Sequence, residues 1–148
     1  MAHAYTVEFR IYGEALEPQT ITKEIGLNPS HIALAGTAWG TRVHRHSVWG
    51  YSGFEEGHSV DWEWLEEGFV YVLDRLWPHR QLIARYKAQY QVAWWIGHFQ
   101  SSFDGGPSLS SSILLRLGEF GADVFIDNHF VDSNEPEESG SKEMSKTK

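Results

Sequence analysis

Cysteine is absent from this chain of 148 residues, and long apolar runs are absent as well. Without cysteine the protein has no disulfide, no thiol nucleophile and no thiolate ligand for a metal. No run of about eighteen apolar residues occurs, and the sequence does not open with a cationic stretch followed by an apolar run, so neither a membrane span nor a secretion signal is predicted. We therefore expect a cytoplasmic protein with no membrane partner.

Positive charge is also scarce. The chain has 12 Lys and Arg against 20 Asp and Glu, which gives a formal net charge of −8. Six acids lie between Glu55 and Glu67 with no Lys or Arg among them. Because basic side chains that contact phosphates supply most of the affinity for nucleic acid, this acidity argues against a nucleic-acid partner.

The length suits one domain, and the pattern of apolar residues predicts a single α+β domain over residues 1–131. Strands are predicted at residues 5–12, within 31–38, around 45–51, at 90–99 and at 122–130. The elements follow the order β-α-β-β-α-β-α-β, without strict alternation of strand and helix. This order favours a mostly antiparallel sheet with helices packed on one face.

Helix boundaries are predicted from capping signals. Pro18 suits a first turn and Gly26 the residue after the last turn of a short helix. A long helix is predicted from an N-cap at Ser59 to a bend or end at Pro78. A third helix is predicted after Ser108 or Ser110, with Gly121 as its stop and a core stripe of Leu109, Ile113, Leu114 and Leu117.

The last residues, 132–148, have no aromatic side chain and one large apolar residue, Met144, among Ser, Glu, Lys and Pro. Such a segment cannot bury enough apolar surface to offset the entropy of ordering its chain. We expect it to be a disordered polar tail.

Several short stretches resemble a known family. They are FRIYG near the start, LEP followed by IT, then GLNP, and later WIGHF with GGPSLSSSILLRLGEFG. Together they resemble the bacterial family catalogued as domain of unknown function 4279 over residues 5–130. The chain departs from the family pattern at Pro107, where an aromatic residue is usual, and at His31, where Thr or a basic residue is expected. The resemblance implies a fold and a bacterial cytoplasmic setting, and it supplies no catalytic residue.

The glycines of FDGGPSLSSS allow two interpretations. Gly105, Gly106 and Ser108 precede a predicted helix, whose free N–H groups are able to bind an anion such as phosphate. A phosphate-binding loop, however, carries a lysine after its second glycine, and no Lys or Arg occurs between residues 88 and 115. The other interpretation is a turn between strand and helix with a serine cap, and ordinary turn chemistry favours it.

The segment WGTRVHRHSVW also allows more than one interpretation. His44 and His46 project from one face if the segment is a strand, and with His58 or His129 as a third ligand they are candidates for a metal site. The segment is also the only cationic patch of an acidic chain. Trp39, Arg42, Arg45 and Trp49 are therefore candidates for binding an acidic or phosphorylated partner, although the two tryptophans equally suit a core.

The segment EEGHSVDWEWLEE opens the predicted long helix. Two residues two positions apart on a helix cannot both face one core, so one of its tryptophans is expected to be exposed. An exposed tryptophan beside carboxylates is a candidate contact for a basic protein. The contact residues predicted here are Trp62, Trp64, Glu63, Glu66 and Glu67.

No catalytic machinery is recognisable, because no nucleophile has a base at a known spacing. We therefore expect a non-enzymatic protein-binding module, for example an inhibitor like an immunity protein that masks a basic partner, and we expect no cofactor. The alternative is a metal- or phosphometabolite-binding protein or enzyme that uses the His- and Arg-rich residues 42–46.

Overall fold

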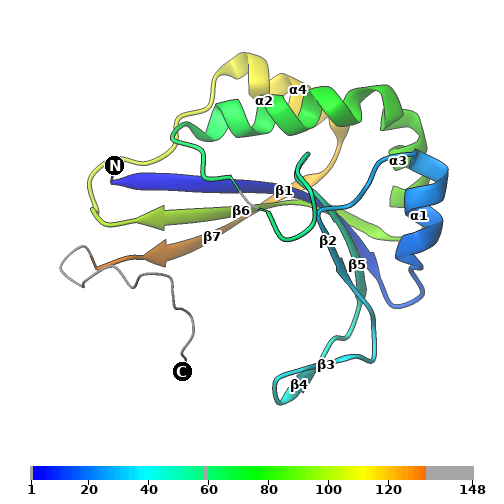
Figure 1. Cartoon of the computed structure of the whole chain (residues 1–148). Helices are drawn as coiled ribbons and strands as arrows, with labels where there is room; N and C mark the ends of the chain where they lie inside the picture. The colour runs from blue at the N-terminus through cyan, green and yellow to red at the C-terminus, as the bar shows by residue number, and fades with distance from the viewer. Residues whose placement is uncertain (1, 59, 133–148) are drawn as a thin grey trace.

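The computed structural model describes residues 2–58 and 60–132, and in this part of the chain a five-stranded sheet organises the fold (Figure 1). Its strands are β1 (His3–Gly13), β2 (His31–Ala33), β5 (Ser47–Tyr51), β6 (Gln91–Gln100) and β7 (Asp123–Phe130), arranged in the order β2-β5-β1-β6-β7. All neighbours are antiparallel except β6 and β7, which are parallel. The predicted α+β fold with a mostly antiparallel sheet is therefore confirmed.

The helices cover one face of this sheet. They are α1 (Pro18–Ile25), α2 (Leu65–Leu76), the 3-10 turn η1 (Trp77–His79), α3 (Arg80–Lys87) and α4 (Ser111–Phe120). Figure 1 shows all four α-helices above the sheet, with α4 connecting β6 to its parallel neighbour β7. The opposite side of the sheet carries no helix in the described residues, and we call it the open face.

Strand β1 defines both faces. Its residues alternate between buried and half-buried along the strand. Val7, Phe9 and Ile11 point to the helices and are at most 3% exposed, whereas Glu8 and Arg10 lie on the open face. Because successive side chains of a strand point to opposite faces, one alternating stretch of sequence supplies the core and the floor of the open face.

Most capping predictions are confirmed. Gly26 ends α1 and Gly121 ends α4, each in the left-handed conformation with φ of 79° and 86°. Ser110 is the N-cap of α4, and its side-chain oxygen accepts a hydrogen bond from the Ile113 N–H at 3.2 Å. Pro78 lies in η1, so it separates α2 from α3, as its missing N–H requires.

Two helix predictions are wrong. The long helix begins at Leu65 with Trp64 as its N-cap, and Ser59 lies outside the described residues. The reason is that Trp62 is extended and exchanges two backbone hydrogen bonds with Tyr5, at 2.8 and 2.7 Å, before the helix starts. Leu114 is 53% exposed, because the stripe that faces the core consists of Ile113, Leu117 and Phe120 at helical spacing.

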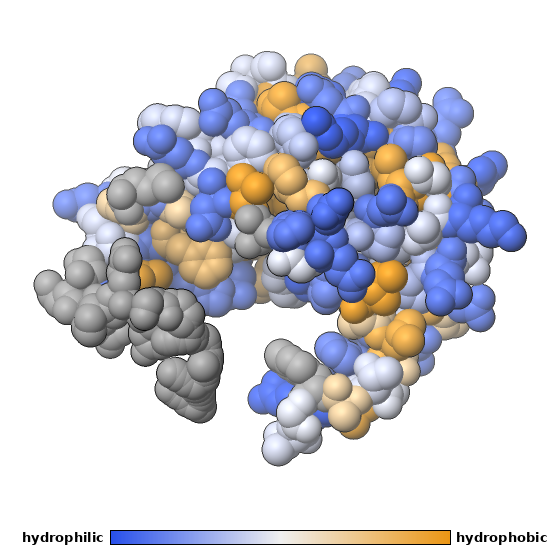
Figure 2. All heavy atoms as spheres, viewed as in Figure 1, coloured by the Kyte–Doolittle hydropathy of each residue, from blue (hydrophilic) through white to orange (hydrophobic). Residues whose placement is uncertain are grey.

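Residues between α1 and β5 contain an element that the sequence did not predict. β2 and β5 lie within the ranges expected for two weak strands, but β3 (Ala38–Trp39) and β4 (Arg42–Val43) form an additional small hairpin. Figure 2 shows this hairpin standing off from the body of the molecule. The predicted tail lies outside the described residues from position 133 onward.

Aromatic side chains fill the centre of the core. Trp94 is fully buried, and its ring lies 5.3 Å from the rings of Phe9 and Phe69 and 5.7 Å from that of Phe120. Trp49 is also fully buried, and its indole N–H donates to Thr22 Oγ1 at 3.0 Å, which ties β5 to α1. No helix in the described part of the chain is long and apolar enough to cross a membrane.

The placement of Trp49 in the core and of Trp64 on the surface can be tested by measuring the free energy of unfolding of variants at each position. Trp49→Ala is expected to lower the free energy of unfolding by about 3–5 kcal/mol, because it leaves a large cavity. Trp64→Ala is expected to change it by no more than about 0.5 kcal/mol, because its side chain is 62% exposed. Urea unfolding of both variants beside the unmodified protein measures the difference, and equal losses would contradict this placement of the two side chains.

Candidate functional site

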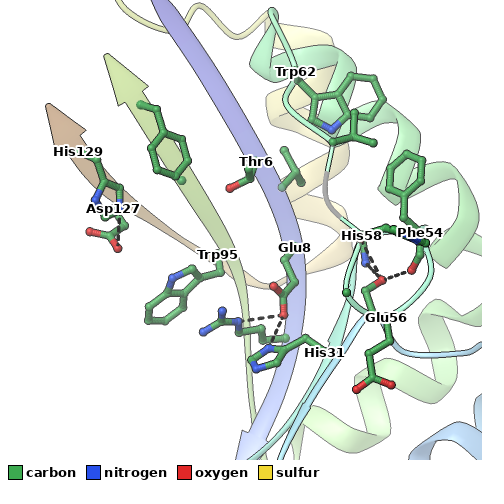
Figure 3. Close-up of a pocket in the computed structure, with 18 residues that line it drawn as sticks. Thr6, Glu8, His31, Phe54, Glu56, His58, Trp62, Trp95, Asp127 and His129 are labelled. Carbon is green, nitrogen blue, oxygen red and sulfur yellow. Dashed lines mark hydrogen bonds and ion pairs between the residues drawn. The ribbon is translucent and has the colours of Figure 1, made fainter. Parts of the chain in front are cut away.

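A groove with a volume of about 560 Å³ lies on the open face. Its floor comes from β1 and β6, one end from β7 and the other from β2 and the loop after β5 (Figure 3). The polar side chains that line it include Thr6, Glu8, Arg10, His31, Glu56, His58, Asp127 and His129. A hollow of this size and composition fits a small molecule or the side chains of a partner.

Glu8 lies at the centre of the groove (Figure 3). Its Oε2 accepts two hydrogen bonds at 3.1 Å, one from Arg10 Nε and one from His31 Nδ1. Among the described residues no hydrogen bond reaches Oε1, while the Glu8 side chain remains 22% exposed. The carboxylate is thus held in place through one oxygen, and the other oxygen is available to a donor that enters the groove.

The electrostatics of Glu8 favour its ionised form. Burial alone raises the pKa of this carboxyl, but the hydrogen bond from His31 and the positive charge of Arg10 outweigh burial. The pKa of Glu8 is therefore lower than its ordinary value of 4.5. The groove holds a negative charge at neutral pH.

Two glycines inside strands make room for this arrangement. A Cβ added to Gly50 would lie 1.9 Å from Glu8 Oε2, and one added to Gly97 would lie 2.5 Å from Thr6 Oγ1. Both distances are shorter than any real carbon contact, so a side chain at either position would displace its neighbour. Glycine in a strand interior often marks such a close approach, and here it keeps the floor of the groove open.

Aromatic rings form the walls. Trp95 stacks against the Arg10 guanidinium at 4.4 Å and lies 4.4 Å from the ring of Phe125. Towards β7, Phe99 stacks on His129 at 4.8 Å. Rings of this kind offer flat apolar surface and a π face for a cation.

A chain of hydrogen bonds crosses the sheet on its helix-covered face, opposite the groove. His3 Nε2 lies 2.7 Å from the Asp104 carbonyl, His3 Nδ1 lies 2.9 Å from His98 Nε2, and His98 Nδ1 lies 2.9 Å from Asn128 Oδ1. Two neutral imidazoles supply only two protons for these three bonds. The third comes from the Asn128 amide group when it is turned to donate, or from an extra proton on one ring.

The tryptophan pair of the acidic segment is divided between two places. Trp62 is half-buried, lies 5.4 Å from the Tyr71 ring and lines the groove. Trp64 is exposed and lines a second hollow of about 200 Å³ together with Glu63, Gly106 and Ser108. Two of the predicted contact residues, Glu63 and Trp64, therefore meet part of the predicted anion loop at this second hollow.

Glu66 has a structural task that the sequence did not reveal. Its two carboxylate oxygens accept hydrogen bonds from the Ser110 N–H at 2.7 Å and the Ser110 hydroxyl at 2.8 Å. It therefore fixes the start of α4 at the helix end where the predicted anion was expected. Glu67 is exposed on α2, and Gly105 takes a positive φ of 83°, as expected of a turn glycine.

The cationic segment is not assembled into one site. Arg42 and Arg45 are exposed on and beside the β3–β4 hairpin, and Trp39 is a residue of β3. The prediction that Trp49 contacts a partner is wrong, because the strand alternation turns this side chain into the core, where it is fully buried. In residues 2–58 and 60–132, His44, His46 and His58 belong to no cluster that could hold a metal.

The central groove residues were missed from the sequence. Glu8 and Arg10 lie on the polar side of an alternating strand. In the sequence this pattern is the same as that of an ordinary solvent-exposed strand face. A signal was present in the isolated glycines of VWGY and WIGHF, since glycine in a strand indicates a close approach. The partners that converge there, His31 and Trp95, come from strands that only the sheet order brings together.

The fold and the groove define a small α+β protein with a polar, aromatic-walled groove on the open face of its sheet. The chain belongs to the family described as Domain of unknown function (DUF4279), whose model matches residues 3–131. This match confirms the family resemblance found in the sequence. No curated protein and no solved structure matches the chain.

The role of Gly50 can be tested by adding one methyl group. Gly50→Ala is expected to lower the free energy of unfolding by about 1–3 kcal/mol, because the Cβ displaces the Glu8 carboxylate. Gly106→Ala is the control, since nothing lies within 4 Å of its Cβ, and is expected to change it by no more than about 0.5 kcal/mol. In urea unfolding, the double variant Gly50→Ala with Glu8→Ala should lose less stability than the sum of the two single variants, because the clash is absent without the carboxylate. If the two losses of unfolding free energy simply add, the proposed clash is contradicted.

Glu8 also gives a prediction about pH. Its pKa is lower in the folded protein than in the unfolded chain, so the unfolded state binds more protons as the pH falls. The stability that Glu8 contributes is complete above the ordinary value of 4.5 and is lost as the pH falls through the folded value. The difference in stability between the unmodified protein and Glu8→Gln should therefore be constant from about pH 6 to pH 5 and shrink towards pH 3. A difference that grows on acidification would refute the assignment.

Proposed function

We propose that this protein is a non-enzymatic binding module of the bacterial cytoplasm that takes a basic segment of a protein partner into the groove of the open face. The observation that carries the proposal is the Glu8 carboxylate, which is anchored through Oε2 while Oε1 faces an aromatic-walled hollow. A lysine ammonium or an arginine guanidinium is the side-chain group that such an oxygen best accepts.

The charges that line the groove support a basic ligand. Three carboxylates, Glu8, Glu56 and Asp127, line it with a single arginine, Arg10. Arg10 is already bonded to Glu8, and its guanidinium is stacked on Trp95. The groove therefore retains a net negative character at neutral pH, in line with the charge of −8 on the whole chain.

Such a surface suits an inhibitor like an immunity protein. Overall acidity steers a basic partner towards the molecule, and aromatic side chains in a desolvated hollow retain it. In this proposal Trp95 and Trp62 are the anchors on opposite sides of Glu8 (Figure 3). Trp64 and its neighbours Glu63 and Glu67 form a separate exposed surface. The variant Trp64→Ala distinguishes binding at this surface from binding in the groove.

Co-purification from a lysate of the protein's own host tests the proposal. The unmodified protein is expected to retain a stoichiometric basic protein that is released at high salt. Trp95→Ala and Thr6→Lys are expected to weaken binding by about 2 kcal/mol or more, roughly thirtyfold, because the first removes an anchor and the second adds a positive charge to the groove. Trp64→Ala is the matched control and should bind normally. Isothermal titration with the identified protein measures the affinities, and thermal melts check that each variant folds.

Two outcomes would overturn the proposal. Binding that survives Trp95→Ala and Thr6→Lys but fails in Trp64→Ala would move the contact to the second hollow. A bait that carries a bound metal or phosphorylated metabolite and no protein would favour the alternative based on the His- and Arg-rich residues 42–46.

A further inference from the structure

Strand β7 forms one edge of the sheet and presents an apolar surface. No strand of the described residues pairs with its outer side. Val124, Ile126 and Phe130 are 43%, 39% and 53% exposed, and Phe130 stacks on Phe103 at 4.6 Å. Apolar atoms come to the surface over β7 and the neighbouring end of β6 (Figure 2).

The backbone of β7 has free hydrogen-bonding groups on a known set of residues. The Val131 N–H donates to the Gln100 carbonyl at 2.6 Å, so residue 131 faces β6. Because backbone groups alternate in direction along a strand, residues 125, 127 and 129 face β6 as well. Residues 124, 126, 128 and 130 therefore point their N–H and C=O groups away from the sheet.

β7 has few of the features that usually protect an edge strand, since its only charged side chains are Asp123 and Asp127 beside His129. Natural edge strands are usually short or carry lysine, proline or a bulge that prevents pairing. β7 is 8 residues long, has no lysine and no proline, and pairs with β6 in continuous register from Asp123 to Phe130. Such an edge is a template for another strand.

We propose that β7 pairs antiparallel with β7 of a second copy of this chain, about a two-fold axis at Asn128. This register places Ile126 opposite Phe130 and Asp127 opposite His129, and it does so twice by symmetry. Apolar side chains then face apolar side chains and each carboxylate faces an imidazole, which are favourable cross-strand pairs. Residues 126, 128 and 130 contribute the backbone bonds.

Neighbouring registers are less favourable. An axis at Asp127 sets two carboxylates directly opposite each other, which is destabilising. An axis at Ile126 sets Phe125 opposite Asp127 and leaves Phe130 without a partner. The sequence of β7 is thus self-complementary in the register centred on Asn128, and this is the argument for a second copy as the occupant.

The proposed pairing extends the binding face. A two-fold axis perpendicular to the sheet keeps both open faces on one side of a continuous ten-stranded sheet. Asp127 and His129 line the groove, and His129 Nε2 lies 3.1 Å from Asp127 Oδ2. In the dimer the second copy supplies another His129 and Asp127 beside them, so each groove continues towards the other.

The mass in solution tests the interface. Sedimentation equilibrium of the full chain is expected to give twice the mass of one chain, which is 16.9 kDa. Ile126→Lys should shift the protein to the monomer, with at least a tenfold loss of dimer affinity, because it places a charge at the centre of the apolar contact. Leu115→Lys is the control, since Leu115 is 65% exposed on α4 and lies outside the interface. Circular dichroism melts check the fold of both variants.

The absence of cysteine allows a test of the register. In Asn128→Cys the two sulfhydryl groups lie on opposed residues whose Cα atoms are about 5.5 Å apart, within the range that a disulfide spans. In Ile126→Cys the corresponding residues are displaced by four positions along the strand, about 14 Å. Under mild oxidation, only Asn128→Cys is expected to form a covalent dimer on a non-reducing gel.

Each other outcome would overturn the proposal. If the unmodified protein is a monomer at 100 μM, roughly the upper range of such measurements, a stable pairing of two β7 strands is excluded. The edge of β7 would then be a site for a different protein or for residues 133–148. A dimer that persists in Ile126→Lys would lie on another surface. Cross-linking of Ile126→Cys in place of Asn128→Cys would establish a different register.

Discussion

The pairing of β1 with strands on both of its sides is the constraint on which the structure depends. β1 lies in the middle of the sheet and pairs with β6 over residues 3–12 and with β5 over residues 9–13. Its alternation puts Phe9 and Ile11 into the core and Glu8 and Arg10 on the open face. A shift of one residue in register would exchange the two sets, so the packing energy of the core also fixes the position of the groove carboxylate.

In the proposed function, the polar cluster at Glu8 serves recognition in addition to the stability that its ion pair contributes. Replacing a half-buried ion pair with well-packed apolar residues is often neutral or stabilising, so such a pair contributes little to the fold by itself. Here the carboxylate also requires a glycine at position 50, because any Cβ there would meet Oε2. Arg10, His31 and Gly50 together hold one oxygen and leave the other facing the hollow. That arrangement suits the binding of a donor.

Much of the fold could be predicted because its signals are local. The alternation of residues 5–12, the aromatic strand at 90–99 and the glycine stops of α1 and α4 depend on neighbours in sequence. Three features that the sequence did not reveal depend on distant contacts. α2 begins late because Trp62 pairs with Tyr5, Trp49 is a core residue because β5 is covered by α1, and Glu66 is used by Ser110 of a distant helix. None of these partners is near in sequence.

The sequence by itself determined the α+β class, the family, the acidic charge and the residues able to alternate between core and surface. Only the tertiary structure decided which polar residues meet. Glu8, His31, Trp95 and Asp127 come from four strands whose order, β2-β5-β1-β6-β7, does not follow the chain, and β6 and β7 are joined in parallel through α4. The order of the strands depends on how the helices pack on one face of the sheet. This packing is the sum of many weak contacts between residues far apart in sequence, so no short stretch of sequence specifies the strand order.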